Sequence, residues 1–334
     1  MGPFRVLIAR LARLNGEAPR IEQVADLPAG DPAAVGDEIR RLFPERRAYV
    51  PAIGGVLPPS RLLWRQENSA KRFAEADYLS ALLAFEHKIA ADKWSFFLIN
   101  PLDGRMLDPA NPSARDVLLS GAPTDELLAE QQQLLDLGLL PRRMEISTLP
   151  MLGGVQHHQA VLVDSAPAAV VEIGNDRTRL SILGKTGVHP CPPIDWGIGA
   201  LAEAAAKDLQ IADAAVARAR LLSADAALLA RAPRLLRALV RHLKPSIERF
   251  EIETGQRVND LYCAFLPPGL GWIAPAVASA LQMQELRVDC PAWLSSLNID
   301  CPAEIASRLG THWLSLFSLI ARLEPTAPNA KKTG

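Results

Sequence analysis

The chain has 334 residues, of which 49% are hydrophobic and 22% are charged, and its formal net charge is −1. This length and composition suit two folded domains with cores of their own and exclude global disorder. A near-zero net charge without a long Lys/Arg block argues against a nucleic-acid-binding protein, which needs a basic face. No stretch approaches the ~18 uninterrupted apolar residues of a membrane helix. We therefore expect a soluble, cytoplasmic protein with no nucleic-acid partner and no direct membrane insertion.

The first half of the chain predicts mixed strands and helices. Asn15-Gly16 is a hairpin dipeptide between two strand-like runs, and Asp31 is a candidate N-cap residue for the helix that follows. Strands are predicted at 4–14, 20–27, 48–56, 60–65, 95–101, 116–120 and 142–146, and helices at 32–43, 75–91 and 124–137. This alternation is typical of an α/β protein.

The second half has a clearer pattern. Strands are predicted at 168–173, 178–184 and 187–190, then a helix at 197–209, a strand at 260–266, a helix at 272–283 and a strand at 286–289. The order βββαβα is that of a ribonuclease-H-like unit. Within it, apolar residues recur at helical spacing between residues 213 and 253, which predicts an inserted amphipathic helical pair. Pro233 should lie near a helix start, Pro245 should kink the longer helix, and Gly255 is a plausible C-terminal cap.

Two segments of the second half resemble one side of an actin-like nucleotide cleft. They are Ala168–Pro190, a strand pair joined by a polar turn, and Asp260–Leu281, a strand that breaks at Pro267-Pro268-Gly269-Leu270-Gly271 and continues as a helix. Within the superfamily of actin, FtsA and the sugar kinases, the chain most resembles the PilM proteins of type IV pilus assembly. Leu134–Leu149 is similar to the linker that leads those proteins into their second lobe.

This resemblance implies an actin-like ATPase fold of the α/β class, with two ribonuclease-H-like lobes. The first lobe would span residues 1–160 and carry a small inserted α/β subdomain at 69–106. The second would span 161–324 and carry the helical insertion at 213–253. Residues 325–334 are rich in proline, lysine and polar residues, and this composition predicts a disordered tail.

The resemblance also implies a function. PilM-type proteins are cytoplasmic scaffolds that bind the N-terminal tail of a PilN-type bitopic inner-membrane protein and link it to the pilus motor, so the chain would be peripheral to that membrane. The alternatives are an active actin-like ATPase or sugar-kinase-type phosphotransferase, and a GspL-like scaffold of type II secretion. The aromatic residues Trp64, Phe73, Tyr78 and Phe85 are candidate partner-binding residues, although core packing accounts for most of the aromatic side chains in this region and leaves one or two as anchors.

The polar turn of the first segment lies where actin-like proteins place a phosphate loop. Such a loop needs a carboxylate to hold hydrated magnesium, then a glycine and a hydroxyl beside the phosphates. Glu172, Gly174 and Thr178 would fill these roles, with Asn175 and Asp176 between them. Asp176 adds a negative charge that would repel phosphate. The turn is therefore either a structural β-hairpin or a working phosphate loop.

The other nucleotide positions are altered. Gly269 and Gly271 would permit close backbone approach to an adenosine, but the two prolines before them remove amide donors. Met1–Leu7 looks like the second strand of the hairpin that carries the first phosphate loop, so either the start is misassigned or that site is gone. No catalytic constellation or metal-ligand spacing is present in the sequence. We therefore expect a degenerate nucleotide cleft, no enzymatic activity and no required cofactor, with residual binding of ATP and magnesium left open.

Overall fold

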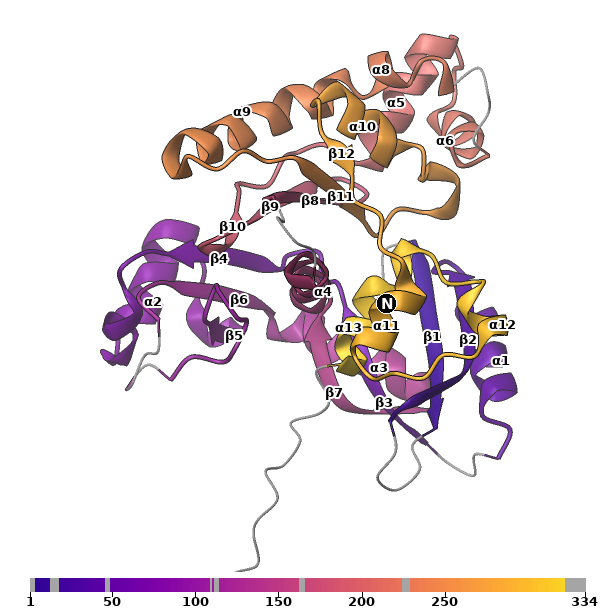
Figure 1. Cartoon of the computed structure of the whole chain (residues 1–334), viewed down its shortest axis with the longest axis horizontal. Coiled ribbons are helices and arrows are strands. Elements are labelled where there is room, and N and C mark those ends of the chain that lie inside the picture. Colours follow the sequence, from indigo (N-terminus) through magenta and orange to yellow (C-terminus); the bar gives the residue numbers. More distant parts are fainter. Residues whose placement is uncertain are drawn as a thin grey trace, which may run out of the picture.

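The computed structural model describes residues 4–12, 18–45, 49–108, 110, 114–161, 166–223 and 229–321. These residues form two lobes and a smaller subdomain (Figure 1). In that view the second lobe lies along the top, the first lobe at the lower right and the subdomain at the lower left. Within the described part of the chain, no helix has the length and apolar character needed to span a membrane.

The second lobe is built on a five-stranded sheet in the order β10-β9-β8-β11-β12. Its strands are β8 (Ala168–Ile173), β9 (Thr178–Gly184), β10 (Gly187–Pro190), β11 (Asp260–Ala264) and β12 (Gln284–Glu285). β9 is antiparallel to both β8 and β10, whereas β11 is parallel to β8 and to β12. The strands predicted at 168–190 and 260–266 therefore share one sheet, as expected for a ribonuclease-H-like unit.

β8 is the central strand, and all six of its residues are buried. Ala169 and Val171 pack in the core formed with helices α5 (Ile198–Leu209) and α10 (Ile273–Ala280). Ala168 and Val170 point to the opposite face and join a second core. Helices thus cover both faces of the sheet, which explains why β8 reads as a continuous apolar run.

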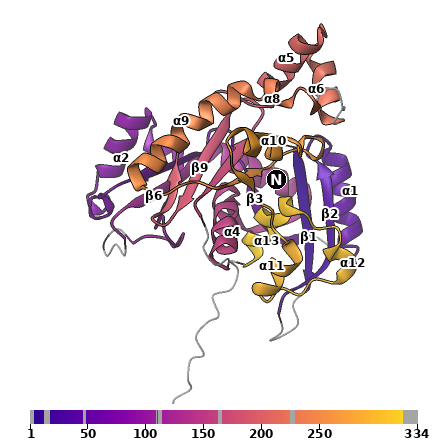
Figure 2. The same cartoon turned by 45° about the horizontal axis from the view of Figure 1, so that its top comes forward.

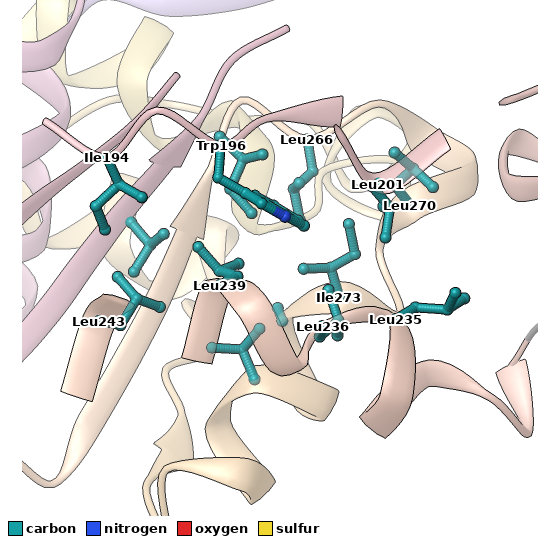
Figure 3. Packing of buried hydrophobic residues seen from close by; sticks show 14 of the residues in the cluster. Ile194, Trp196, Leu201, Leu235, Leu236, Leu239, Leu243, Leu266, Leu270 and Ile273 are labelled. Atoms are coloured by element: carbon teal, nitrogen blue, oxygen red, sulfur yellow. The ribbon is translucent and has the colours of Figure 1, made fainter. Parts of the chain in front are cut away.

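The helical insertion lies on one face of this sheet. It comprises α6 (Ala214–Leu222), α8 (Ala232–Leu235) and α9 (Arg237–Thr254). The predicted stripe is buried at Leu239, Leu243 and Ile247, and Figure 3 shows the first two of these side chains packed beside Ile194 and Trp196. Pro245 lies inside α9, and Gly255 ends that helix with a φ of 68°. The predicted helices and cap are confirmed.

Among the described residues, the first lobe contains two two-stranded sheets. β1 (Arg5–Ala12) pairs antiparallel with β2 (Arg20–Pro28), and β3 (Val50–Val56) pairs parallel with β7 (Leu139–Ile146). The helices are α1 (Pro32–Leu42), α3 (Thr124–Asp136) and α4 (Thr148–Val161). The Asp31 carboxylate accepts a hydrogen bond from the Ala34 amide at 2.9 Å, so the predicted N-cap is confirmed. The Asn15-Gly16 turn lies outside the described residues.

The C-terminal helices return to the first lobe. They are α11 (Cys290–Ser296), α12 (Ala303–Ala306) and α13 (Leu314–Ala321); α13 packs against α4 and β3, and α12 packs against β2. This differs from the predicted assignment of 161–324 to the second lobe. The buried residues Leu314 and Phe317 lie in a core that is shared by β2, by α4 and by the face of the second-lobe sheet that carries Ala168 and Val170. The predicted tail at 325–334 lies outside the described residues.

The short last strand also differs from the prediction. It is β12 at Gln284–Glu285, not a strand at 286–289. The reason is local, because Asp289 caps α11 by accepting a hydrogen bond from the Ala292 amide at 3.1 Å. A residue that begins a helix in this way cannot continue a sheet ladder.

The inserted subdomain is wider than the predicted 69–106. It is a three-stranded sheet in the order β4-β6-β5, formed by β4 (Leu62–Gln66), β5 (Trp94–Ile99) and β6 (Val117–Pro123). The helix predicted at 75–91 is replaced by a short α2 (Tyr78–Leu82) and a π-turn at Leu83–His87 that ends at Lys88 with a φ of 57°. Leu83 is buried in this segment, and Tyr78, Leu79 and Leu82 are partly buried against the core of the subdomain.

Candidate functional site

The predicted nucleotide positions follow the carboxyl ends of two neighbouring strands in the second-lobe sheet, β8 and β11. Glu172 is near the end of β8 and is opposite Ala264 at the end of β11. The segment 267–271 after β11 is called the glycine elbow here. It and the turn after β8 therefore leave the sheet side by side. In open α/β sheets, the carboxyl ends of parallel strands are the usual place for a ligand. The strand ends that precede the two predicted loops are therefore neighbours in the sheet.

The Glu172 carboxylate, however, is already engaged by the protein itself. It is 3% exposed, and its Oε2 accepts hydrogen bonds from Arg61 Nη2 and from Thr148 Oγ1, both at 2.8 Å. Arg61 Nε also donates to Thr148 Oγ1 at 3.1 Å, which closes a three-membered network. Arg61 immediately precedes β4 and Thr148 begins α4, so the network joins the second lobe to the rest of the molecule. This carboxylate is neutralised by a buried cation.

A second guanidinium lies beside this network. Arg179 is opposite Glu172 in the β8–β9 pair, and its Nη2 donates to the Pro59 carbonyl at 2.7 Å. Burial, together with repulsion from Arg61, lowers the pKa of Arg179 to about 10. The cluster of Arg61, Glu172 and Arg179 therefore carries two cations and one anion at neutral pH. A hydrated magnesium ion would be repelled by this excess of positive charge.

The turn between β8 and β9 is folded against helix α5. The Gly174 amide donates to the Arg177 carbonyl at 2.9 Å, which closes the turn. The carbonyls of Gly174 and Asn175 accept hydrogen bonds from Ile198 and Gly199 at the start of α5, at 3.0 and 2.9 Å. A helix N-terminus is a ready anion site, but at α5 the turn carbonyls take these amide donors.

The side chains of Thr178 and Asp176, which would face phosphates, also have hydrogen-bond partners within the protein. Thr178 is fully buried, and its Oγ1 donates to the Trp196 carbonyl at 2.7 Å. Asp176 Oδ1 accepts a hydrogen bond from Asn175 Nδ2 at 2.8 Å. The structural-hairpin interpretation of this segment agrees with every one of these contacts.

The glycine elbow approaches protein, not open space. A Cβ placed on Gly269 would overlap the carbonyl oxygen of Leu222, at the end of α6. The close approach that glycine permits here is therefore used for packing against the helical insertion. Just before the elbow, Phe265 has a φ of 59°, a left-handed conformation that costs a non-glycine residue about 1–3 kcal/mol.

A cavity between the lobes remains beside the elbow. Its lining includes Arg5 from the first lobe, Phe265 and Gly271 from the second, and His312 from the C-terminal segment. Its empty space, including the part open to solvent, is about 840 Å³. Burial, together with repulsion from Arg5, lowers the pKa of His312 to about 4, so this imidazole is neutral at pH 7. Gly271 is the one predicted nucleotide residue that lines this cavity.

The described residues contain no group of three or more His, Cys, Asp or Glu residues placed to hold a metal ion. Burial raises the pKa of Cys263 and of Cys290 to about 12, so neither is a thiolate at neutral pH. His157 packs edge-on against Trp293, with 6.0 Å between ring centroids, and serves as a packing residue.

The candidate partner-binding residues separate into two groups. Phe73 is buried, with 5.0 Å between its ring centroid and that of Tyr78, and Trp64 packs against His87 in the same way at 4.4 Å. These three side chains belong to the packing of the subdomain. Phe85 is different, because 75% of it is exposed at the π-turn.

Sequence reasoning missed the residues that neutralise Glu172. Arg61 lies 111 positions before it and Thr148 lies 24 positions before it. The sequence around Arg61 contains two prolines and then an apolar strand, and nothing in it indicates a partner in the other lobe. A glutamate such as Glu172 at the end of an otherwise apolar strand needs a polar partner when it is buried. The sequence gives that signal, but it does not identify the partner.

No protein-family model and no curated protein matches this sequence. Among solved structures, a chain of the "PilM-PilN type IV pilus biogenesis complex" is similar to it with a TM-score of 0.68 and 18% identity, covering 97% of both chains. A weaker similarity is to the cytoplasmic domain of EpsL, an inner-membrane component of the type II secretion system of Vibrio cholerae, with a TM-score of 0.35 and 15% identity over 62% of this chain and 72% of that one. Another is to a Bacteroides thetaiotaomicron protein with an actin-like ATPase fold, with a TM-score of 0.40 and 6% identity over 92% of this chain and 87% of that one.

The first of these similarities defines the class of fold. It extends over nearly the whole of both chains, and it confirms the predicted two-lobed actin-like fold and the likeness to PilM at the level of fold. The other two TM-scores are too low to support an argument. At 18% identity the similarity concerns the fold alone.

Proposed function

We propose that this protein is an actin-like scaffold of a type IV pilus or a related assembly machine. In this role it binds the N-terminal tail of a PilN-type inner-membrane protein in the cytoplasm, and it is peripheral to the membrane through that partner. The observation that carries the proposal is the shared fold with a chain of the PilM–PilN complex over 97% of both chains.

The second part of the proposal is that the cleft no longer works as an ATPase site. Its support is the Glu172 network, in which a cation from outside the second lobe holds the carboxylate expected to bind magnesium. An active ATPase or sugar-kinase-type phosphotransferase would need that carboxylate free for metal. A GspL-like scaffold would have the same cleft and would differ in its membrane partner.

The inserted subdomain is the proposed surface for the partner. It contributes four of the large hydrophobic side chains that are exposed in the described residues: Phe85, Phe97, Leu102 and Met106. Isolated exposed apolar residues are common, but several on one small subdomain are typical of an interaction surface. An amphipathic or extended peptide docks its apolar side chains on surfaces of this kind.

Calorimetry with a synthetic peptide tests the proposal. The peptide is the N-terminal tail of a PilN-type protein from the organism that makes this chain. Saturable binding with a dissociation constant of about 10 μM or tighter is expected, equivalent to about −7 kcal/mol. Absence of binding at 1 mM peptide would contradict the scaffold role, and a matched peptide from a GspL partner tests the alternative machine.

Replacing Phe85 with serine should weaken this binding at least tenfold. The Phe85 ring is 75% exposed, so removing it costs the free protein few contacts, whereas a partner can bury it. Ile252→Ser is the matched control, because Ile252 is 84% exposed on α9, in the other lobe. Equal affinities for the two variants would place the binding surface away from Phe85. Circular dichroism should show both variants folded, since neither side chain is part of a core.

A further inference from the structure

The helical insertion of the second lobe carries a basic surface. Residues 213–247 contain seven Lys or Arg residues against two Asp residues, whereas the whole chain has a formal net charge of −1. Four of the cations recur at steps of three, four and three residues along α8 and α9: Arg234, Arg237, Arg241 and Lys244. Residues with this spacing share one side of a helix. All four are exposed, so they lie on the side opposite the buried stripe of α9.

Most of these cations lack an acidic partner. Four of them form no ion pair with any described residue: Arg218 and Arg220 of α6, and Arg237 and Arg241 of α9. Arg234 pairs with Asp208, and Lys244 Nζ lies 3.7 Å from the exposed carboxylate of Glu248. The insertion therefore keeps an excess of positive charge that an anionic partner can neutralise.

Exposed aliphatic side chains accompany the cations. The insertion contributes Val216 and Leu222 from α6, and Leu229 from the segment before α8. Val216 lies four residues before Arg220, and Leu222 lies four residues after Arg218. Residues spaced by four are neighbours on a helix surface, so each of these aliphatic side chains lies beside a guanidinium. A surface that mixes arginine with aliphatic side chains is typical of a helix lying against lipid headgroups.

The insertion also has a suitable shape. Helices α5, α6 and α8 lie together at one end of the second lobe, and α9 runs from there across the lobe (Figures 1 and 2). The positive charge ends within α9, because Glu248, Glu251 and Glu253 follow its basic half. An anionic surface would therefore meet the end formed by α6, α8 and residues 237–247 of α9, which is called the basic corner below.

We propose that the basic corner binds directly to the surface of a membrane that contains anionic phospholipids. Its guanidinium groups pair with lipid phosphates, for which the planar fork of arginine has a matching geometry. The aliphatic side chains of α6 enter the headgroup region, and no helix crosses the bilayer. This contact is additional to the one through a PilN-type partner.

Lipid is favoured over an acidic protein surface by the side chains between the cations. Charge complementarity alone would suit either partner. The exposed aliphatic residues of the insertion, however, gain from burial at the boundary between headgroups and acyl chains. Each Lys or Arg near an anionic leaflet contributes only about fivefold to affinity, so several cations and the aliphatic contacts must act together.

Co-sedimentation of the purified protein with lipid vesicles tests the proposal. Vesicles of phosphatidylcholine with about 30% phosphatidylglycerol should bind at least about tenfold more tightly than vesicles of phosphatidylcholine alone. Raising the salt concentration from about 0.1 M to about 0.5 M should release the protein, because the charges are exposed to solvent. No binding to the anionic vesicles, or equal binding to both kinds, would overturn the proposal and leave an acidic protein as the partner of the basic corner.

Two double variants test the location. Replacing Arg237 and Arg241 with glutamine should weaken binding to the anionic vesicles by about tenfold or more. The matched control replaces Arg40 and Arg41 of α1, whose side chains are 60% and 59% exposed in the first lobe, and it should bind as the parent does. Equal losses in the two double variants would show a response to net charge alone and would overturn the proposal.

Circular dichroism should show both double variants folded, because all four substituted side chains are exposed and glutamine is a good helix former. The assay contains no partner protein. A failure to bind vesicles is therefore distinguishable from a failure to bind the PilN-type peptide.

Discussion

Replacing Arg61 with alanine is expected to lower the free energy of unfolding by about 3–5 kcal/mol. The Arg61 side chain is 9% exposed and Glu172 is 3% exposed, so the substitution leaves a carboxylate buried without its cation. Thr148 still donates one hydrogen bond, but a hydroxyl brings no charge. Chemical denaturation followed by circular dichroism measures this loss.

Two variants control for the Arg61 result. Arg177→Ala removes an ion pair with Asp195 whose side chains are 58% and 84% exposed, and it should cost at most about 1 kcal/mol. Adding Glu172→Gln to Arg61→Ala removes the buried charge and should recover part of the loss, which a double-mutant cycle measures. A loss for Arg61→Ala no greater than that for Arg177→Ala would mean that the network does not hold the lobes together.

Gly269→Ala is expected to destabilise the second lobe by about 3 kcal/mol, at the upper end of the range for overpacking. The new methyl group would overlap the backbone carbonyl of Leu222, which cannot move aside as a flexible side chain can. The change should separate the elbow from α6 and expose apolar surface of the insertion. Thermal unfolding should therefore begin at a lower temperature than in the parent protein.

Gly30→Ala is the control for the elbow. No atom lies within 4 Å of a Cβ placed at Gly30, so this substitution should change the free energy of unfolding by no more than about 0.5 kcal/mol. If Gly269→Ala were as stable as Gly30→Ala, the elbow would have to be free of α6. The glycine would then be available for a ligand.

The second lobe could be predicted closely from the sequence because its elements are locally specified. Turn residues separate its apolar runs, namely Asn175–Arg177 between the first two and Gly184 and Gly187 between the next two. The observed β8, β9 and β10 begin and end at the predicted residues. The insertion was predicted from its apolar stripe and from Pro245 and Gly255, which are local signals of the same kind.

The first lobe was harder because its order depends on contacts distant in sequence. Leu314 and Phe317 pack in a core that both lobes share, and nothing near them in the sequence indicates this. The helix predicted at 75–91 is shorter than expected. Tyr78, Leu79 and Leu82 pack against the core of the subdomain, but the helical run ends at His87 and Phe85 is left exposed.

The candidate site was predicted in part. The sequence placed Glu172 and Gly269 at one cleft, and the parallel pairing of β8 with β11 brings their turns to the same sheet edge. It could not reveal that Arg61 binds Glu172 or that Gly269 packs against Leu222. Arg61 lies in the connection before β4 and Leu222 lies in the helical insertion. Where these segments pack is decided by contacts that are distant in the sequence.

Calorimetric titration of this protein with ATP in the presence of magnesium tests the central claim most directly. We expect no saturable heat at 1 mM nucleotide. Arg61 and Thr148 hold the Glu172 carboxylate, the turn carbonyls accept hydrogen bonds from the first amides of α5, and the Gly174 amide closes the turn. Micromolar affinity for Mg-ATP that is lost in Gly271→Trp, a substitution that fills the cavity between the lobes, would contradict the account.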